Sequence, residues 1–337
     1  MTSPSDGKFP LSTWRGVARR ARAGVRFRRI TDEYERTMSS VNLLDPMKKV
    51  LITGGGGMLA RDLRSVLSAR GSEFQVVAPS RAQLDVTNAE HVRGVLASFR
   101  PALVFNCAAF TKVDLCETDP RAQAVNADAV ATVAEACRKA GAKLVHLSTD
   151  FVFDGTKGSP YVEEDRPAPL SAYGRTKREG EEHALGAPGA LVVRASWLFG
   201  NGGPNFVEAM LKQAEDGKKE VRVVADQVGR PTATTDLAEA LVALAEAGAS
   251  GIVHYANRGE VSWNAFAREI YRLAGFSDVE VRPITSSELA RPAVRPACSV
   301  LSTGKYERLT GKTPRDFREP LAEYLGRRRG AARPENI

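Results

Sequence analysis

The sequence has few cysteines and no long apolar run. Four cysteines occur in 337 residues, and they form no C-x-x-C pair and lie near no cluster of histidines. This pattern argues against a zinc site and a disulfide framework, and it fits reduced thiols in the cytoplasm. No run of about 18 apolar residues or apolar secretion segment is present, so we expect a cytoplasmic protein with no membrane partner.

Neither positive nor negative charge strongly dominates over most of the chain. Hydrophobic residues make up 43% and charged residues 26%, which is ordinary for a globular protein. The net charge is +8, and residues 1–46 hold nine basic and five acidic side chains, so they contribute +4 of it. The remaining chain shows no stripe of basic and aromatic residues. We therefore expect no nucleic-acid partner.

The order of apolar segments indicates how the chain is divided. Residues 1–46 lack a sustained apolar period and contain an arginine-rich run, so we predict a disordered basic extension there. The first strand then starts close to Met47. We predict a dinucleotide-binding domain over residues 47–195, mainly a substrate-binding lobe over 196–330, and a tail over 331–337.

Short apolar runs alternate with longer amphipathic ones from Lys49 onward, which is typical of βαβ units. The predicted strands are Lys49–Thr53, Phe74–Ala78, Leu103–Asn106, Lys143–Leu147 and Leu191–Arg194. The predicted helices are Arg61–Ala69, Ala89–Phe99, Arg121–Ala140 and Tyr173–Leu185. This pattern predicts an α/β protein of the Rossmann type, with a doubly wound parallel sheet and a smaller C-terminal α/β lobe.

A glycine-rich loop follows the first predicted strand directly. Its G-x-x-G-x-x-A pattern places Gly54, Gly57 and Ala60 at the entry to a helix. Such a loop lets the backbone approach a pyrophosphate, which the helix N-terminus then binds through free N–H groups. The alternative is a glycine-rich turn that only connects strand and helix. The strand before the loop and the βα pattern after it favour dinucleotide binding.

The residues after the second strand bear on the choice of cofactor. An acidic residue at this place would accept a hydrogen bond from the ribose of NAD, but the sequence has Ser80 and Arg81. A hydroxyl and a guanidinium suit a 2′-phosphate, so we expect NADPH and leave NADH open. A solvated surface arginine is the competing interpretation of Arg81.

A Y-x-x-x-K pair enters the last helix of this half. Tyr173 and Lys177 are four residues apart, so both project from one helical face. Reduction of a ketone requires a proton donor for the alkoxide, and a nearby cation would lower the pKa of the phenol. Thr149 ends a buried strand at the carboxyl edge, where it could bind the substrate oxygen. Ser148 and Thr149 could instead cap the following turn.

Several longer motifs occur in a fixed order and narrow the assignment. They are Gly54–Ala60, Asn106–Asp114, Ser148–Gly155, Tyr173–Lys177, Arg194–Trp197, Asp226–Thr232 and Arg295–Ser299. Together they resemble the dTDP-4-dehydrorhamnose reductase family, within the extended short-chain dehydrogenase/reductase superfamily. The resemblance spans about residues 47–328.

The resemblance implies NAD(P)H-dependent reduction of the 4-keto group of dTDP-4-dehydro-6-deoxy-L-mannose to dTDP-L-rhamnose. It implies that Tyr173 donates the proton, Lys177 binds the nicotinamide ribose and Thr149 orients the keto oxygen. Asp150 and Trp197 would contact the sugar nucleotide. The residues expected at the cofactor, beside Tyr173 and Lys177, are Gly54, Gly57, Met58, Leu59, Ser80, Arg81, Asp85, Val86, Ala109, Phe110 and Thr111.

Some family properties are not carried over, and two other functions stay open. Members that bind magnesium use glutamates at a dimer contact, whereas the counterparts here include Asp62 and Thr235, so we expect no metal. A homodimer is left as an open alternative. The first other function is a nucleotide-sugar epimerase or dehydratase, against which Phe151 after Asp150 argues. The second is a non-catalytic subunit similar to the regulatory partner of methionine adenosyltransferase.

Overall fold

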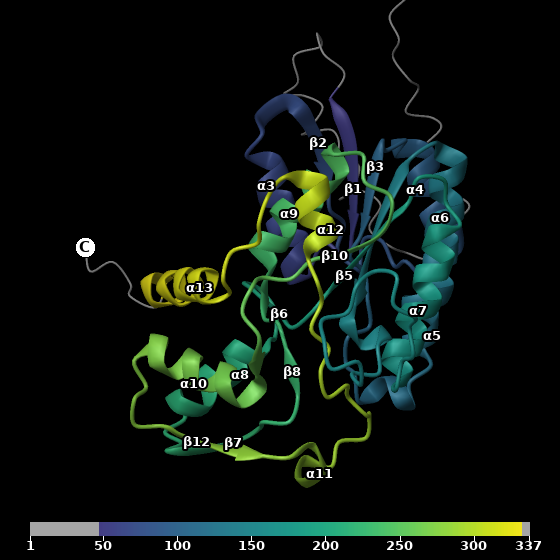
Figure 1. Ribbon diagram of the computed structural model, residues 1–337. Helices are drawn as coiled ribbons and strands as arrows, with labels where there is room; N and C mark the ends of the chain where they lie inside the picture. The colour runs from purple at the N-terminus through teal and green to yellow at the C-terminus, as the bar shows by residue number, and fades with distance from the viewer. Residues whose placement is uncertain (1–46, 332–337) are drawn as a thin grey trace, which may run out of the picture.

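A six-stranded parallel sheet forms the centre of the protein (Figure 1). The computed structural model describes residues 47–331, so the predicted extension 1–46 and residues 332–337 lie outside the described part. The strand order is β10-β5-β4-β3-β1-β2, and every neighbouring pair is parallel. The strands are β1 (Lys48–Thr53), β2 (Phe74–Val77), β3 (Leu103–Asn106), β4 (Lys143–Thr149), β5 (Leu191–Ala195) and β10 (Gly251–His254).

Helices cover both faces of this sheet, which confirms the predicted Rossmann-type fold. One face carries α3 (Met58–Ser68), α9 (Thr234–Glu246) and α12 (Gly304–Thr310). The other face carries α4 (Ala89–Phe99), α6 (Ala129–Ala140) and α7 (Ala172–Leu185). Two separate buried clusters, one on each face, hold the three layers together. Each fully buried Leu or Val in them contributes about 1.5–3 kcal/mol, so the sheet is rigid enough to position a site.

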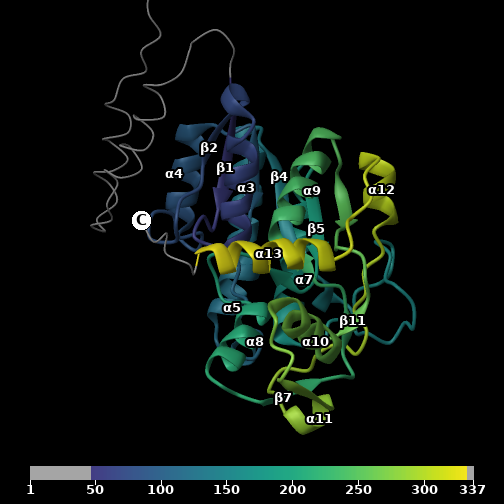
Figure 2. The same cartoon turned by 90° about the vertical axis from the view of Figure 1, so that its left-hand side faces the viewer.

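The smaller lobe lies below one end of the sheet in Figure 1 and has its own apolar cluster. Its helices α8 (Phe206–Glu215) and α10 (Trp263–Ala274) pack near the parallel pair of β7 (Glu220–Val224) and β12 (Glu280–Ile284). Figure 2 shows α13 (Arg318–Ala331) crossing between the two lobes. The shorter elements are β6 (Leu198–Phe199), β8 (Val228–Gly229), β9 (Thr232–Ala233), β11 (Val261–Ser262) and α11 (Ser286–Leu289).

The structure and the predicted elements differ by one residue at several ends, and by more at the following places. The first helix begins at Met58 rather than Arg61, because Gly57 is its N-cap directly after the glycine loop. β4 continues two residues further, to Thr149. The segment predicted as mainly substrate lobe also returns to the sheet, where it supplies α9 and the edge strand β10. Within residues 47–331, no helix is long and apolar enough to cross a membrane.

A buried ion pair joins α7 to the sheet. Arg194 on β5 donates to both carboxylate oxygens of Glu181 at 2.7 and 2.8 Å, and both side chains are almost fully buried. Ser148 on β4 donates to the same carboxylate at 2.6 Å. Arg194 also contacts His254 on β10 at 3.3 Å. Because α7 carries Tyr173 and Lys177, this pair fixes their distance from the ends of β4 and β5.

Substitution of Arg194 by Met should destabilise the protein strongly. Methionine is similar in length to arginine but is apolar. The buried Glu181 carboxylate is therefore left without its bidentate partner. Loss of one partner of a buried pair costs about 3–5 kcal/mol, which urea unfolding would measure. Arg93→Met is the control, because Arg93 and Glu135 form a half-exposed ion pair with an N–O distance of 3.6 Å. Loss of this pair should lower the free energy of unfolding by less than about 1 kcal/mol. Equal losses in both variants would contradict the structural role of Arg194.

Candidate active site

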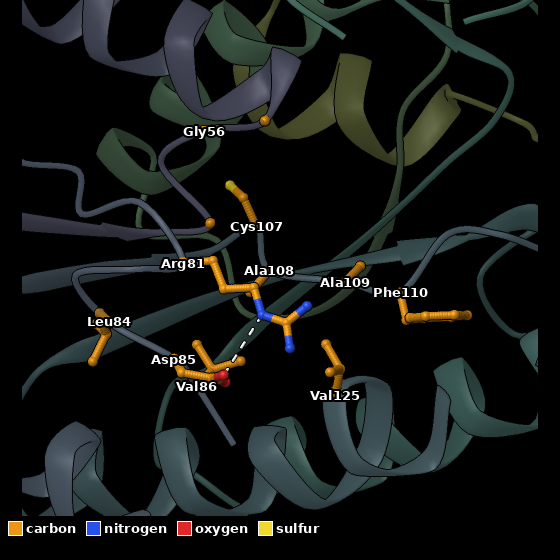
Figure 3. A pocket seen from close by; sticks show the side chains of 12 residues that line it. Gly56, Arg81, Leu84, Asp85, Val86, Cys107, Ala108, Ala109, Phe110 and Val125 are labelled. Carbon is orange, nitrogen blue, oxygen red and sulfur yellow. Dashed lines mark ion pairs between the residues drawn. The ribbon is translucent and has the colours of Figure 1, made fainter. Parts of the chain in front are cut away.

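The first pocket lies at the carboxyl ends of β1, β2 and β3. Strand β1 has β2 on one side and β3 on the other, so the strand order reverses at β1. Open α/β sheets bind ligands at such a switch point. The pocket has a volume of about 260 Å³. Its lining residues, most of them labelled in Figure 3, are Gly54, Gly56, Gly57, Arg81, Leu84, Asp85, Val86, Cys107, Ala108, Ala109, Phe110 and Val125.

The glycine loop brings the backbone close to the neighbouring strand ends. Gly54 has a φ of +68°, in the left-handed region that favours glycine. A Cβ atom on Gly55 would lie 2.1 Å from the carbonyl oxygen of Ala78, so no side chain fits there. Gly57 caps α3 without a side-chain hydrogen bond, which leaves this helix end suited to an anion.

Met58 and Leu59 begin α3 but do not line the pocket. The sulfur of Met58 accepts a hydrogen bond from Asn205 at the start of α8, and Leu59 is buried in the apolar cluster below the helix. Any contact of these two residues with a phosphate would therefore come from their backbone N–H groups.

Arg81 and Asp85 meet at the outer part of the pocket. Figure 3 shows the Arg81 side chain extending over the pocket, with its guanidinium Nε 3.5 Å from the Asp85 carboxylate. The Arg81 side chain is 68% exposed, so it is accessible to a ligand. Ser80 does not line the pocket, and its backbone N–H donates to Gln83 at 2.8 Å.

The loop after β3 is held by one buried asparagine. Asn126 accepts a hydrogen bond from the Phe110 amide at 2.8 Å and donates to the Phe110 carbonyl at 3.1 Å. Asn126 is fully buried and lies in a π-helical turn, Ala124–Asp128, inside the helix predicted over 121–140. Such turns occur often at functional sites. The amphipathic pattern of this helix gave no sign of the turn or of the role of Asn126.

Tyr173 and Thr149 lie together at the carboxyl end of β4. Burial raises the pKa of Tyr173, and a hydrogen bond with Thr149 acts in the opposite direction. Thr149 also accepts from the Phe151 amide at 3.2 Å and donates to Asp150 at 3.0 Å, so it caps the next turn as well. The ring of Phe151 packs edge-on against Tyr173, with the centroids 5.6 Å apart. The phenol is therefore protonated at neutral pH.

The expected effect of Lys177 on the pKa of Tyr173 is not found. The Lys177 ammonium donates to the carbonyl of Leu147 and lies 3.5 Å from Nε2 of His146, so it faces the sheet. Burial lowers the pKa of Lys177 to about 8, although the charge of Glu181 acts in the opposite direction. The carbonyl at the strand end binds the ammonium, and an effect of Lys177 on the Tyr173 phenol stays a prediction.

A row of buried polar side chains continues from Lys177 across the sheet. His146 contacts Asn106 at 3.1 Å, and Asn106 accepts from Thr53 at 2.6 Å. These three residues are register neighbours on β4, β3 and β1. Burial and the nearby Lys177 charge lower the pKa of His146 well below its usual value, so its ring is neutral.

The two residues predicted at the substrate are both held by the later part of the chain. Burial raises the pKa of Asp150 to about 6, despite hydrogen bonds from Ser299 and Thr149. Trp197 follows β5 with a φ of +50° and stacks on Trp263, with ring centroids 3.5 Å apart. A strained backbone at this position points to a functional constraint, but one face of the indole is already occupied.

Comparisons with known proteins agree with this geometry. The family described as the RmlD substrate binding domain matches residues 47–329. The chain belongs to the dTDP-4-dehydrorhamnose reductase family. It is 44% identical to the dTDP-4-dehydrorhamnose reductase of Streptomyces griseus, over 82% of this chain and 93% of that protein. It is 45% identical to a probable dTDP-4,6-dihydroxy-2-methyloxan-3-one 4-ketoreductase of Streptomyces antibioticus, over 84% and 99%.

A solved structure of the family has the same fold. The dTDP-4-dehydrorhamnose reductase of Bacillus anthracis, solved in complex with NADP, superimposes with a TM-score of 0.79. It is 34% identical, and the match covers 83% of this chain and 99% of that chain. Asp62 accepts a hydrogen bond from Thr234 at 2.5 Å, and residues 47–331 hold no group of three metal-ligating side chains.

The structure gathers most of the predicted cofactor residues of the family and adds others. Leu84, Cys107, Ala108 and Val125 line the pocket although the sequence did not single them out. Cys107 and Ala108 directly precede predicted residues, so their place after β3 could have indicated them. Thr111 lines a different pocket, formed with Arg291 and Arg295. Val125 comes from a helix distant in sequence, and only the packing of the π-helical turn places it here.

Asn126→Ala should loosen the loop after β3. The change removes both hydrogen bonds to Phe110, and each buried group left without a partner costs about 1–3 kcal/mol. Urea unfolding should show the loss, and hydrogen exchange at the Phe110 amide should become faster. Gln123→Ala is the control on the same helix, because its amide bonds Glu179 and Asp128 near the surface. Unchanged exchange at Phe110 would show that Asn126 does not hold the loop.

Proposed function

We propose that this protein is a cytoplasmic NADPH-dependent reductase of dTDP-4-dehydro-6-deoxy-L-mannose, with dTDP-L-rhamnose as its product. The observation that carries the proposal is the pair of half-buried Tyr173 and buried Thr149, which lies at the same sheet edge as the glycine-loop pocket. The names and the NADP complex of its relatives support the choice of substrate and cofactor.

The residues of the first pocket fit a dinucleotide. Gly55 leaves no room for a Cβ atom, and the uncapped start of α3 offers N–H groups and a partial positive charge to a pyrophosphate. Asp85 and Val86 would hold the adenosine end, and Ala109 and Phe110 the central part. When bound, the cofactor supplies a hydride to the carbonyl carbon of the substrate.

Tyr173 would donate the proton that completes the reduction. Burial keeps its phenol neutral, so its Oη carries a proton that can pass to the alkoxide oxygen at C4. Thr149 would hold the same oxygen in line with that phenol. Because the Thr149 hydroxyl already bonds Asp150 and the Phe151 amide, it has little freedom to rotate.

Lys177 would position the nicotinamide ribose. Its ammonium bonds the Leu147 carbonyl, and Glu181 lies one turn further along α7. With a pKa of about 8, the amine is mostly protonated at neutral pH and loses this charge as the pH rises above 8. The positive charge of Lys177 also stabilises electron-rich oxygen atoms in the site.

The other two functions fit the chain less well. A dehydratase or epimerase must return the hydride to its own substrate, and the S-T-D motif followed by Phe151 argues against that use. A non-catalytic subunit has no need for a tyrosine bonded to Thr149, nor for a buried lysine whose pKa is lowered toward neutrality. The reductase function accounts for both features.

Tyr173→Phe should lower turnover by about a hundred- to ten-thousand-fold, because it keeps the ring and removes the proton donor. The measurement follows NADPH absorbance with the 4-keto sugar nucleotide generated in situ. Binding of NADPH should survive, since the glycine loop provides the phosphate contacts. Tyr306→Phe is a control, because that ring lies in the apolar cluster behind the sheet. Full activity in Tyr173→Phe would refute the role of the phenol.

Arg81→Ala should weaken NADPH much more than NADH. The guanidinium is accessible, and its half-exposed pair with Asp85 can open to bind the 2′-phosphate of NADPH. Dissociation constants for the two cofactors, measured by fluorescence titration, should change by different factors. An equal loss for both cofactors would show that Arg81 does not bind the ribose phosphate. Such a result would not contradict the reductase proposal.

A further inference from the structure

A second pocket lies on the other side of the loop that follows β3. Its volume is about 380 Å³. Residues 107–110 of this loop line the first pocket, and residues 111–115 line the second one. The remaining walls are Arg291 and Arg295, from the segment after α11. One loop therefore separates two pockets, and the first already accounts for the dinucleotide.

The second pocket carries a net positive charge. Lys112, Arg291 and Arg295 surround a single carboxylate, Asp114, so three positive charges minus one negative leave +2. Asp114 accepts from Arg295 at 2.9 and 3.0 Å and from Arg291 at 3.2 Å. These bonds hold the two guanidinium groups side by side. Lys112 forms no ion pair within residues 47–331, and the Arg291 side chain is 52% exposed, so both can accept a ligand.

The walls of this pocket are tied to the proposed catalytic residues. Arg295 and Ser299 belong to one segment, and the Ser299 hydroxyl bonds the carboxylate of Asp150, next to Thr149. A Cβ atom on Gly155 would lie 2.6 Å from the Ala297 amide, so the segment rests on the loop after β4.

A second contact connects the loop after β3 to α7. Glu117 accepts a hydrogen bond from the backbone of Ala172, next to Tyr173, at 2.8 Å. The segments that form the second pocket are therefore joined to both elements that would bind the keto group.

We propose that Lys112, Arg291 and Arg295 bind the diphosphate of the sugar nucleotide. This inference rests on the proposed function, whose substrate joins its sugar to its nucleoside through a diphosphate. Two arginines held on one carboxylate can offer further N–H groups to phosphate oxygens, and the uncompensated charge of +2 balances a dianionic group. Leu115, a lining residue of the pocket, is 46% exposed and offers an apolar surface to a sugar or a base.

The test is calorimetric titration of dTDP and of inorganic diphosphate into protein saturated with NADP⁺. Saturation occupies the phosphate sites of the first pocket, so the remaining anion binding reports on the second one. The double variant Lys112→Ala/Arg291→Ala should bind both ligands at least tenfold more weakly, and the affinity of the wild type should fall more steeply with added salt. Arg291→Lys should retain part of the affinity, and the affinity for NADP⁺ should not change.

Arg282→Ala is the matched control. Its side chain is 58% exposed, similar to that of Arg291, and pairs with Glu220 at 3.3 Å and with Glu280 at 3.4 Å, but it lies on β12 in the smaller lobe. This variant should bind dTDP like the wild type. Equal dTDP affinity in the double variant and the wild type would overturn the second site, as would a wild type that binds neither anion. Turnover of the 4-keto substrate tests the proposed function separately, because the site can fail while NADPH oxidation persists.

Discussion

The ion pair between Arg194 and Glu181 is the constraint on which the proposed site depends. It crosses from β5 to α7 inside the layer between sheet and helix, where water cannot replace either partner. Ser148 joins it from β4 and His254 from β10, so one carboxylate and one guanidinium connect three strands to one helix. A shift of α7 by even one ångström would separate its phenol from the end of β4, and such shifts are costly for catalysis.

The loop after β3 organises the ligand side of the protein in a similar way. Asn126 holds its middle at Phe110, and Asp114 holds its end against two arginines. The loop thereby has a fixed path with one pocket on each side. A dinucleotide in the first pocket and a sugar nucleotide in the second would approach each other at the carboxyl edge of β4, where the proposed proton donor lies.

The second half of the chain closes this edge. Ser299 bonds Asp150, Trp197 stacks on Trp263, and α13 crosses between the lobes. These contacts relate residues that are distant in the sequence, such as Asp150 and Ser299, which are 149 positions apart. The later part of the chain therefore also acts on the carboxylate beside Thr149, because the Ser299 hydrogen bond lowers the pKa that burial raises.

The sequence by itself determined the first five strands of the sheet, the helices between them and the order of the motifs, because apolar periodicity and glycine spacing are local properties of the chain. It also placed Tyr173, Lys177 and Thr149 at one edge, since the carboxyl ends of parallel strands must meet there. Only the tertiary structure decided which way the Lys177 ammonium points, because the Leu147 carbonyl competes for it. The π-helical turn at Asn126 and the cationic pocket around Asp114 were equally beyond the sequence, since each depends on contacts between segments that are distant in the chain.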